Sequence, residues 1–200
     1  MLQLKTDFNG VLADMREPTR LALEEVSGLE IPNDRFCGKK LVGSNVLFFP
    51  QGNGPRRSVT SKEWEQAKSL IYDGHGFSHR VKPIEGVRES LHQLWGMGLD
   101  IGIVSSCWGI SVERVWKWIN FYDMPISDVV LHENHKTARY AGADVVVDDE
   151  LRHLIGLLDE PLVTPILMLI SEVVLPEKYA HITLVTNWKG VVECTRALLN

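Results

Sequence analysis

The chain has 200 residues, of which 44% are hydrophobic and 24% are charged. This composition is typical of a globular protein with a sizeable core, and it excludes a disordered or fibrous chain. Its 21 basic and 26 acidic residues give a formal net charge of −5. Duplex nucleic acid is therefore not expected as a partner, whereas a small anion held in a local basic pocket is compatible with this charge.

The sequence gives no signal for export or for a membrane. The first residues contain no apolar stretch long enough for a signal peptide. The longest uncharged apolar run, 161–171, is well short of the roughly 20 residues that a membrane span needs. The three cysteines include no CxxC pair, so neither a disulfide framework nor a zinc ribbon is indicated. We therefore expect a cytoplasmic protein.

The predicted elements alternate between strands and helices along most of the chain. A strand over 2–6 precedes a helix over 18–26, an irregular stretch over 28–59 and a helix over 60–73. Thr60 and Glu63 fit a capping box at the start of that last helix. The second half continues, in chain order, with a helix (86–95), a strand (100–104), a helix (110–121), strands (128–131 and 144–147), a helix (151–158), strands (165–170 and 181–185) and a helix (188–199).

Apolar strands separated by helices predict an α/β fold with a parallel sheet covered on both faces. Three of these strands end in polar side chains: Asp7, Ser105 and the pair Asp148-Asp149. Ligands of such sheets bind beyond the carboxyl ends of the strands, so we expect these side chains to converge at one edge. The region from about 14 to 80 lacks the alternation and is interpreted as an insertion.

Four segments resemble, in order, the motifs of the haloacid dehalogenase-like (HAD) hydrolases. Asp7-Phe-Asn9-Gly10 resembles the first motif, which reads Asp-x-Asp-Gly-Thr/Val in the phosphatases of that superfamily. The strand ending at Ser105 resembles the second motif, Lys136 fits the third, and Asp148-Asp149 fits the fourth. The resemblance implies a Rossmann-like core over 1–14 and 80–200, with a small, mainly helical C1-type cap inserted over 15–79.

Two further stretches are similar to the 5′(3′)-deoxyribonucleotidases within that superfamily. His135-Lys136-Thr137, followed by Gly142 and the two aspartates, resembles their Lys-Thr…Gly…Asp-Asp stretch. The segment 82–86, Lys-Pro-Ile-Glu-Gly, resembles their Pro-x-x-Gly lead-in to a helix. The resemblance implies a Mg²⁺-dependent phosphomonoesterase that acts on a small phosphate ester, with a nucleoside monophosphate as the expected substrate.

The expected catalytic chemistry rests on Asp7, Asn9, Ser105 and Lys136. The Asp7 carboxylate can attack phosphorus and form an aspartyl-phosphate. Ser105 can donate a hydrogen bond to a phosphoryl oxygen, and Lys136 can neutralise charge that shifts during transfer. Taken alone, Asp7 could be a turn residue and Lys136 a surface lysine; the four segments in order favour the site.

The expected metal ligands are Asp7, Asp148 and Asp149, together with Asn9, whose backbone carbonyl the resemblance adds. Three neighbouring carboxylates repel one another unless a cation lies between them. Hard oxygen ligands that also meet a phosphate suit Mg²⁺. A plainer alternative for Asp149 is that it caps the helix that follows.

Asn9 departs from the pattern, because the phosphatases of the superfamily carry an Asp there as general acid and base. An amide does not exchange protons in this way, and such catalysis contributes about 10²–10⁴-fold. Three explanations are open: an engineered change, a natural residue with another group supplying the proton, or a degenerate phosphatase that only binds a phosphate ligand. A HAD-like hydrolase that cleaves a different bond is a further alternative.

Substrate contacts are expected from the insertion and from the strand ends. Phe48 and Phe49 could present flat apolar surfaces to a nucleobase, with the cap's own core as the alternative position for these rings. Arg56 lies in a Gly/Pro loop and could meet either a phosphate or only solvent. The sequence does not specify an oligomeric state. The remaining predicted contacts are Gly10, Ser106 and Trp108.

Overall fold

The computed structural model describes residues 2–33, 48–50, 55–73, 76–106, 109–131, 140, 142–169 and 175–199. The chain divides into two compact units, one comprising Met1–Ala13 with Pro83–Asn200 and the other comprising Asp14–Lys82. We call them the core unit and the inserted unit. Two short strands, β2 (Ala13–Asp14) and β5 (Lys82–Pro83), form a small sheet where the chain leaves and re-enters the core unit.

The core unit is built on a six-stranded sheet in the order β10-β9-β8-β1-β6-β7. Each recorded pairing between these strands is parallel. Leu4 of β1 lies opposite Ile101 of β6 on one side and Val145 of β8 on the other, so β1 is central. The predicted parallel α/β sheet is confirmed, with β1 (Leu2–Thr6), β6 (Leu99–Ser105), β7 (Asp128–Leu131), β8 (Val145–Asp148), β9 (Thr164–Met168) and β10 (Thr183–Val185).

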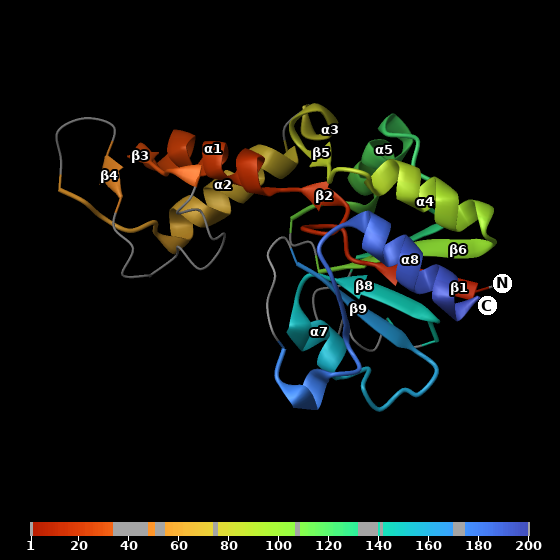
Figure 1. Cartoon of the computed structure of the whole chain (residues 1–200). Coiled ribbons are helices and arrows are strands. Elements are labelled where there is room, and N and C mark those ends of the chain that lie inside the picture. The colour runs from red at the N-terminus through yellow and green to blue at the C-terminus, as the bar shows by residue number, and fades with distance from the viewer. Residues whose placement is uncertain are drawn as a thin grey trace. The chain divides into compact units, whose positions relative to one another are not determined.

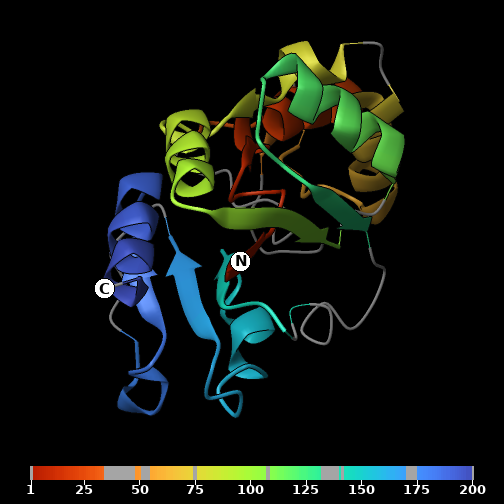
Figure 2. The same ribbon diagram turned by 90° about the vertical axis from the view of Figure 1, so that its right-hand side faces the viewer.

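Helices cover both faces of this sheet. Figures 1 and 2 show α4 (Val87–Gly96), α5 (Val112–Phe121) and α8 (Trp188–Leu198) on one face and α7 (Leu151–Ile155) on the other. Right-handed crossovers explain the faces of α4, α5 and α7. The chain moves from β1 to β6 and then to β7 in one direction across the sheet, and from β8 to β9 in the opposite direction. Helix α7 is shorter than the predicted 151–158 because it ends at Gly156. In the part of the chain that the structure describes, no helix has both the length and the hydropathy to cross a bilayer.

The inserted unit pairs two helices, α1 (Arg16–Ser27) and α2 (Ser61–Asp73), with the short helix α3 (Phe77–Arg80) and the antiparallel strands β3 (Leu29–Glu30) and β4 (Phe49–Pro50). Helix α1 ends at Gly28, whose φ of 62° is the left-handed conformation that favours glycine. The predicted capping box at α2 is confirmed. The Thr60 backbone N–H donates to Oε2 of Glu63 over 2.8 Å, and the Glu63 N–H donates to Oγ1 of Thr60 over 3.3 Å.

The interior of the inserted unit contains the aromatic rings of Phe48, Trp64 and Phe77, all of which are buried. In the same unit, the guanidinium of Arg57 donates to both carboxylate oxygens of Glu63, over 2.6 and 3.0 Å. This contact lowers the pKa of Glu63 from 4.5 to about 2. Arg57 therefore holds the start of α2 to the segment before it.

The core layer between the sheet and α7 is a continuous cluster of buried side chains. Val146 of β8 belongs to this layer. Side chains two positions apart on a strand lie on the same face, so the Asp148 side chain also points toward α7. Tyr140 is buried in the same layer. The other members are Val104, Ala143, Leu154, Leu157, Leu167 and Ile182.

Candidate active site

The turn that follows β1 places Asp7 at the carboxyl edge of the sheet. The Asp7 backbone N–H donates to the carbonyl of Val147 over 2.9 Å, which continues the pairing with β8 beyond the end of β1. The chain then folds back, because two backbone N–H groups donate to the carbonyl of Phe8. The indole of Trp188 in α8 donates to the carbonyl of Val11 over 2.8 Å. Neighbouring elements thus anchor this turn at both its ends.

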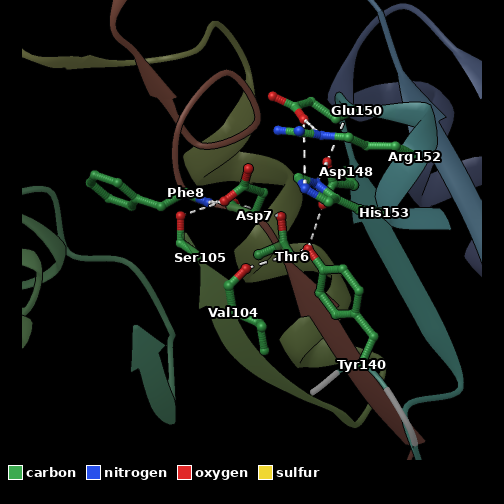
Figure 3. A network of polar contacts seen from close by, with 10 residues as sticks. All are labelled: Thr6, Asp7, Phe8, Val104, Ser105, Tyr140, Asp148, Glu150, Arg152 and His153. Atoms are coloured by element: carbon green, nitrogen blue, oxygen red, sulfur yellow. Dashed lines mark hydrogen bonds and ion pairs between the residues drawn. The ribbon is translucent and has the colours of Figure 1, made fainter. Parts of the chain in front are cut away.

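The Asp7 carboxylate is held in one orientation by two donors (Figure 3). Its Oδ1 accepts hydrogen bonds from the Ser105 hydroxyl, over 2.5 Å, and from the Phe8 backbone N–H, over 2.6 Å. Ser105 is the last residue of β6, the strand beside β1. Both Asp7 and Ser105 are buried. The arrangement fixes a carboxylate at the end of the central strand.

Asp148 and Asp149 bring two further carboxylates to Asp7. Asp148 ends β8, the other neighbour of β1, and it is fully buried. Carboxylate oxygens of Asp7, Asp148 and Asp149 all lie within 4.8 Å of one another. Three carboxylates at this spacing repel one another, and oxygen ligands of this kind bind Mg²⁺ or another hard divalent cation. The residues present therefore fit a divalent cation.

Gly10 allows the Asp149 carboxylate to approach the turn. Its φ of 77° is in the left-handed region, and a Cβ at this position would lie 2.3 Å from Oδ2 of Asp149. Only glycine accommodates both the backbone conformation and the neighbouring carboxylate. The sequence motif indicated Gly10 as a substrate contact, but it did not indicate this approach of Asp149.

Asn9 contributes a buried oxygen to the same turn. Its Oδ1 has no hydrogen-bond partner among the residues that the structure describes. A buried polar atom without a partner is costly and rare. This amide oxygen could accept a donor from a bound ligand.

A chain of polar contacts runs from Asp148 to the surface (Figure 3). Oδ2 of Asp148 accepts a hydrogen bond from the Tyr140 hydroxyl over 2.7 Å, and Nδ1 of His153 lies 3.2 Å from both carboxylate oxygens. The other ring nitrogen of His153 lies 3.6 Å from Glu150, which is itself paired with Arg152. Burial, with Asp148 and Asp7 nearby, raises the pKa of Tyr140 well above its ordinary value, so the hydroxyl keeps its proton.

Tyr140 and His153 were missed by the sequence analysis. Neither belongs to one of the four segments that resemble HAD motifs, and neither has a spacing that distinguishes it from a core tyrosine or a surface histidine. The available signal was the position of His153 in the first turn of the helix directly after the aspartate pair. The N-cap position of that helix is Glu150, so the alternative that Asp149 occupies the N-cap position is wrong.

The structure brings some of the predicted site residues together and leaves others apart. Asp7, Asn9 and Gly10 share the turn after β1, near Ser105, Asp148 and Asp149. Ser106 follows at the end of β6 and is half-buried. Lys136 and Trp108 lie outside the described residues, and the Phe49 side chain is likewise not described, although its backbone belongs to β4.

Phe48 and Arg56 lie in the inserted unit. Of the two positions considered for the Phe48 ring, the structure shows the one in the core of the inserted unit, because the ring is only 2% exposed and its backbone pairs with Arg57. The core of this small unit requires large apolar side chains, which explains the burial. Arg56 is exposed. The ring of Phe48 is therefore among the interior side chains of its own unit.

Comparison with known proteins identifies similar folds only among solved structures. No family model and no curated protein matches the chain. A candidate phosphatase from Clostridium difficile is 13% identical, with a TM-score of 0.65, over 96% of this chain and 97% of that one. A haloacid dehalogenase-like family hydrolase from Xanthomonas campestris is 15% identical, with a TM-score of 0.59, over 99% and 96%. A predicted phosphoglycolate phosphatase from Haemophilus somnus is 14% identical, with a TM-score of 0.55, over 96% and 97%.

These structures show that the chain has the Rossmann-like α/β fold of HAD-superfamily hydrolases. At these levels of identity the likeness concerns the fold. The cluster of Asp7, Asp148 and Asp149 at the carboxyl edge of the sheet is a property of this chain's own residues. Fold and cluster together define the candidate active site.

Proposed function

We propose that this protein is a Mg²⁺-dependent phosphohydrolase that cleaves a small phosphate monoester through an aspartyl-phosphate on Asp7. The observation that carries the proposal is the oriented Asp7 carboxylate, with Oδ1 bonded to Ser105 and with Asp148 and Asp149 within 4.8 Å. A carboxylate held at the switch point of a parallel sheet is placed where such folds bind their ligands. The HAD-like neighbours support hydrolysis as the reaction class.

In the proposed reaction, Asp7 acts as the nucleophile. Because Oδ1 accepts the bonds from Ser105 and Phe8, we assign the attack to Oδ2. The new bond joins Oδ2 to phosphorus while the bond from phosphorus to the ester oxygen breaks, and the leaving oxygen takes a proton. Water then attacks phosphorus and loses a proton while the bond between Oδ2 and phosphorus breaks, which releases inorganic phosphate and restores the Asp7 carboxylate.

Three carboxylates would hold the cation in this proposal: Asp7, Asp148 and Asp149. When bound, Mg²⁺ offsets the negative charge of the carboxylates and of the phosphate. Ser105 fixes the orientation of Asp7, and Lys136, which lies outside the described residues, is assigned by resemblance to neutralise charge during transfer. Asn9 cannot serve as general acid, so the proton for the leaving group comes from another donor or from solvent.

The finer proposal is that the substrate is a nucleoside monophosphate and that the inserted unit serves as a cap. It is supported by the resemblance of Lys136, Thr137 and the aspartate pair to the 5′(3′)-deoxyribonucleotidases. Phe48 is buried within its own unit, so its ring is not assigned to stack on the nucleobase. In this proposal, the nucleobase stacks on other predicted contacts, such as Trp108 and Phe49. A cytoplasmic location belongs to the same proposal.

Asn9 favours a second candidate function, a phosphate-binding protein that no longer turns over its ligand. Its amide occupies the turn beside Asp7, where the superfamily's phosphatases carry a carboxyl group, and its Oδ1 is buried. Such a protein would bind phosphate esters with Mg²⁺ and release no phosphate. The two candidates share the binding site and differ in chemistry, so one assay separates them.

The test is phosphate release from deoxynucleotides, ribonucleotides and sugar phosphates with Mg²⁺, for the natural chain, Asn9→Asp and Asp7→Asn. The proposal expects turnover by the natural chain, a rate about 10²–10⁴-fold higher for Asn9→Asp, and none for Asp7→Asn. Turnover only in Asn9→Asp would favour the binding protein. A rate that Asp7→Asn leaves unchanged would contradict the assignment of Asp7 as nucleophile.

A further inference from the structure

Tyr140 links the two strands on either side of β1. Its hydroxyl donates to Oδ2 of Asp148, at the end of β8, over 2.7 Å, and the same hydrogen is shared with the carbonyl of Val104, in β6, at the longer distance of 3.3 Å. The two strands are not neighbours, because β1 with Asp7 lies between them. The Tyr140 side chain therefore lies across the end of β1, on the face of the sheet that α7 covers, and contacts both neighbouring strands (Figure 3).

The Asp148 carboxylate has three polar neighbours on this face. Besides the Tyr140 hydroxyl on Oδ2, the Glu150 backbone N–H donates to Oδ1 over 2.8 Å. The Nδ1 atom of His153 lies 3.2 Å from both oxygens. Asp148 is fully buried, as is Tyr140, so neither side chain can exchange its partner for bulk water. Asp149, the third carboxylate of the cluster, is half-buried beside Gly10.

We propose that Tyr140 is a positioning residue, whose hydroxyl fixes the Asp148 carboxylate to the end of β6 so that it faces the cation shared with Asp7 and Asp149. The inference rests on the proposed divalent cation site. Partners that hydrogen-bond to a metal ligand orient that ligand, and their loss typically weakens metal affinity or activity by about 10–100-fold. Tyr140 does not touch the substrate in this arrangement; it acts through Asp148.

The experiment compares Mg²⁺ binding, measured by calorimetry at one pH in the presence of inorganic phosphate, for the natural chain, Tyr140→Phe and Tyr179→Phe. Tyr140→Phe removes one hydroxyl and keeps the buried ring. Tyr179→Phe removes one hydroxyl from a ring packed against the same core cluster and is the matched control. We expect Mg²⁺ affinity to fall about 10-fold or more for Tyr140→Phe and to be unchanged for Tyr179→Phe.

A double-mutant cycle distinguishes positioning from a general loss of packing. If Tyr140 acts through Asp148, Tyr140→Phe has no further effect on Mg²⁺ affinity once Asp148 is replaced by Asn. Circular dichroism checks that each variant is folded. Should Tyr140→Phe fail to fold, His153→Ala removes a different neighbour of the Asp148 carboxylate and is expected to weaken Mg²⁺ binding. His153→Asn retains a side-chain nitrogen and is expected to weaken Mg²⁺ binding less.

The outcomes separate this inference from the proposed function. Equal Mg²⁺ affinity in the natural chain and Tyr140→Phe would overturn the positioning by Tyr140, whether or not the protein releases phosphate. Weaker binding in Tyr140→Phe, together with no phosphate release from any ester, would support the positioning and overturn the hydrolase. A natural chain that binds no Mg²⁺ would overturn both.

Discussion

The Ser105 hydroxyl lies 2.5 Å from Oδ1 of Asp7, although 98 positions separate the two residues in the chain. The bond joins the ends of β6 and β1, and both side chains are buried. A bond between two buried groups is shielded from competing water. It therefore determines which oxygen of Asp7 is directed away from the sheet.

Ser105→Ala is expected to lower the rate of phosphate release by about 10²-fold, because it removes a fixed donor from the nucleophilic carboxylate of Asp7. The rate is measured at saturating Mg²⁺, in the Asn9→Asp background if the natural chain is slow. Ser106→Ala is the control, since Ser106 is only half-buried and follows the end of β6. A larger effect at Ser106 than at Ser105 would show that the wrong serine has been assigned.

Asp7→Asn is expected to abolish turnover and to stabilise the protein in the absence of divalent cations. The asparagine Oδ1 can still accept the bonds from Ser105 and Phe8, while its neutral amide removes one of three neighbouring charges. We expect the free energy of unfolding in EDTA to rise by about 1–2 kcal/mol. Urea unfolding with and without Mg²⁺ measures this, and the advantage of Asp7→Asn should shrink when Mg²⁺ is added. A less stable Asp7→Asn in EDTA would argue against strong repulsion in the cluster.

Gly10→Ala is expected to disturb the cation site as well as the turn. The new Cβ would meet Oδ2 of Asp149 at 2.3 Å, so the carboxylate must move. Gly28→Ala is a matched control, because Gly28 also has a positive φ but nothing lies within 4 Å of a Cβ there. Both variants should lose about 1–2 kcal/mol of stability from backbone strain, and only Gly10→Ala should also lose Mg²⁺ affinity. Equal Mg²⁺ affinity in the two variants would contradict the contact.

Glu63 is expected to remain ionised in mildly acidic solution. Its pKa falls from 4.5 to about 2 because Arg57 donates to its carboxylate. A folded pKa below the unfolded value means that the pair contributes stability above pH 4.5 and loses it as the pH falls toward 2. Carbon-13 NMR of the Glu63 carboxyl group can follow this titration. In Arg57→Gln the midpoint should move back toward 4.5, and an unchanged midpoint would exclude Arg57 as the cause.

The sequence predicted which side chains lie at the carboxyl edge of the sheet, because this follows from the local pattern of apolar strands that end in polar residues. Asp7, Ser105 and Asp148 each end or follow an apolar strand, and parallel strands end at one edge. The alternation of strands and helices was sufficient to predict the sheet. The capping box of Thr60 and Glu63 was also visible, because it depends on two residues three positions apart.

The rest depends on tertiary packing that no local pattern records. Tyr140 reaches Asp148 only because the layer beneath the sheet places it there. The sequence left two positions open for the Phe48 ring, and only the packing of the inserted unit shows that the ring is buried in its small core. No local pattern indicated that the Arg57 guanidinium pairs with the Glu63 carboxylate.

The central position of β1 has a consequence for how the chain folds during synthesis. Leu4 of β1 pairs with Ile101 of β6 and Val145 of β8. The ribosome therefore synthesises β1 long before either of the strands that pair with it. Such distant pairings make folding slow, and they leave β1 without partners on the ribosome. Helices α1 and α2 of the inserted unit are complete well before β8 emerges. A nascent chain should therefore carry a folded insertion while its carboxylate cluster does not yet exist, which predicts that chaperones engage the growing core rather than the insertion.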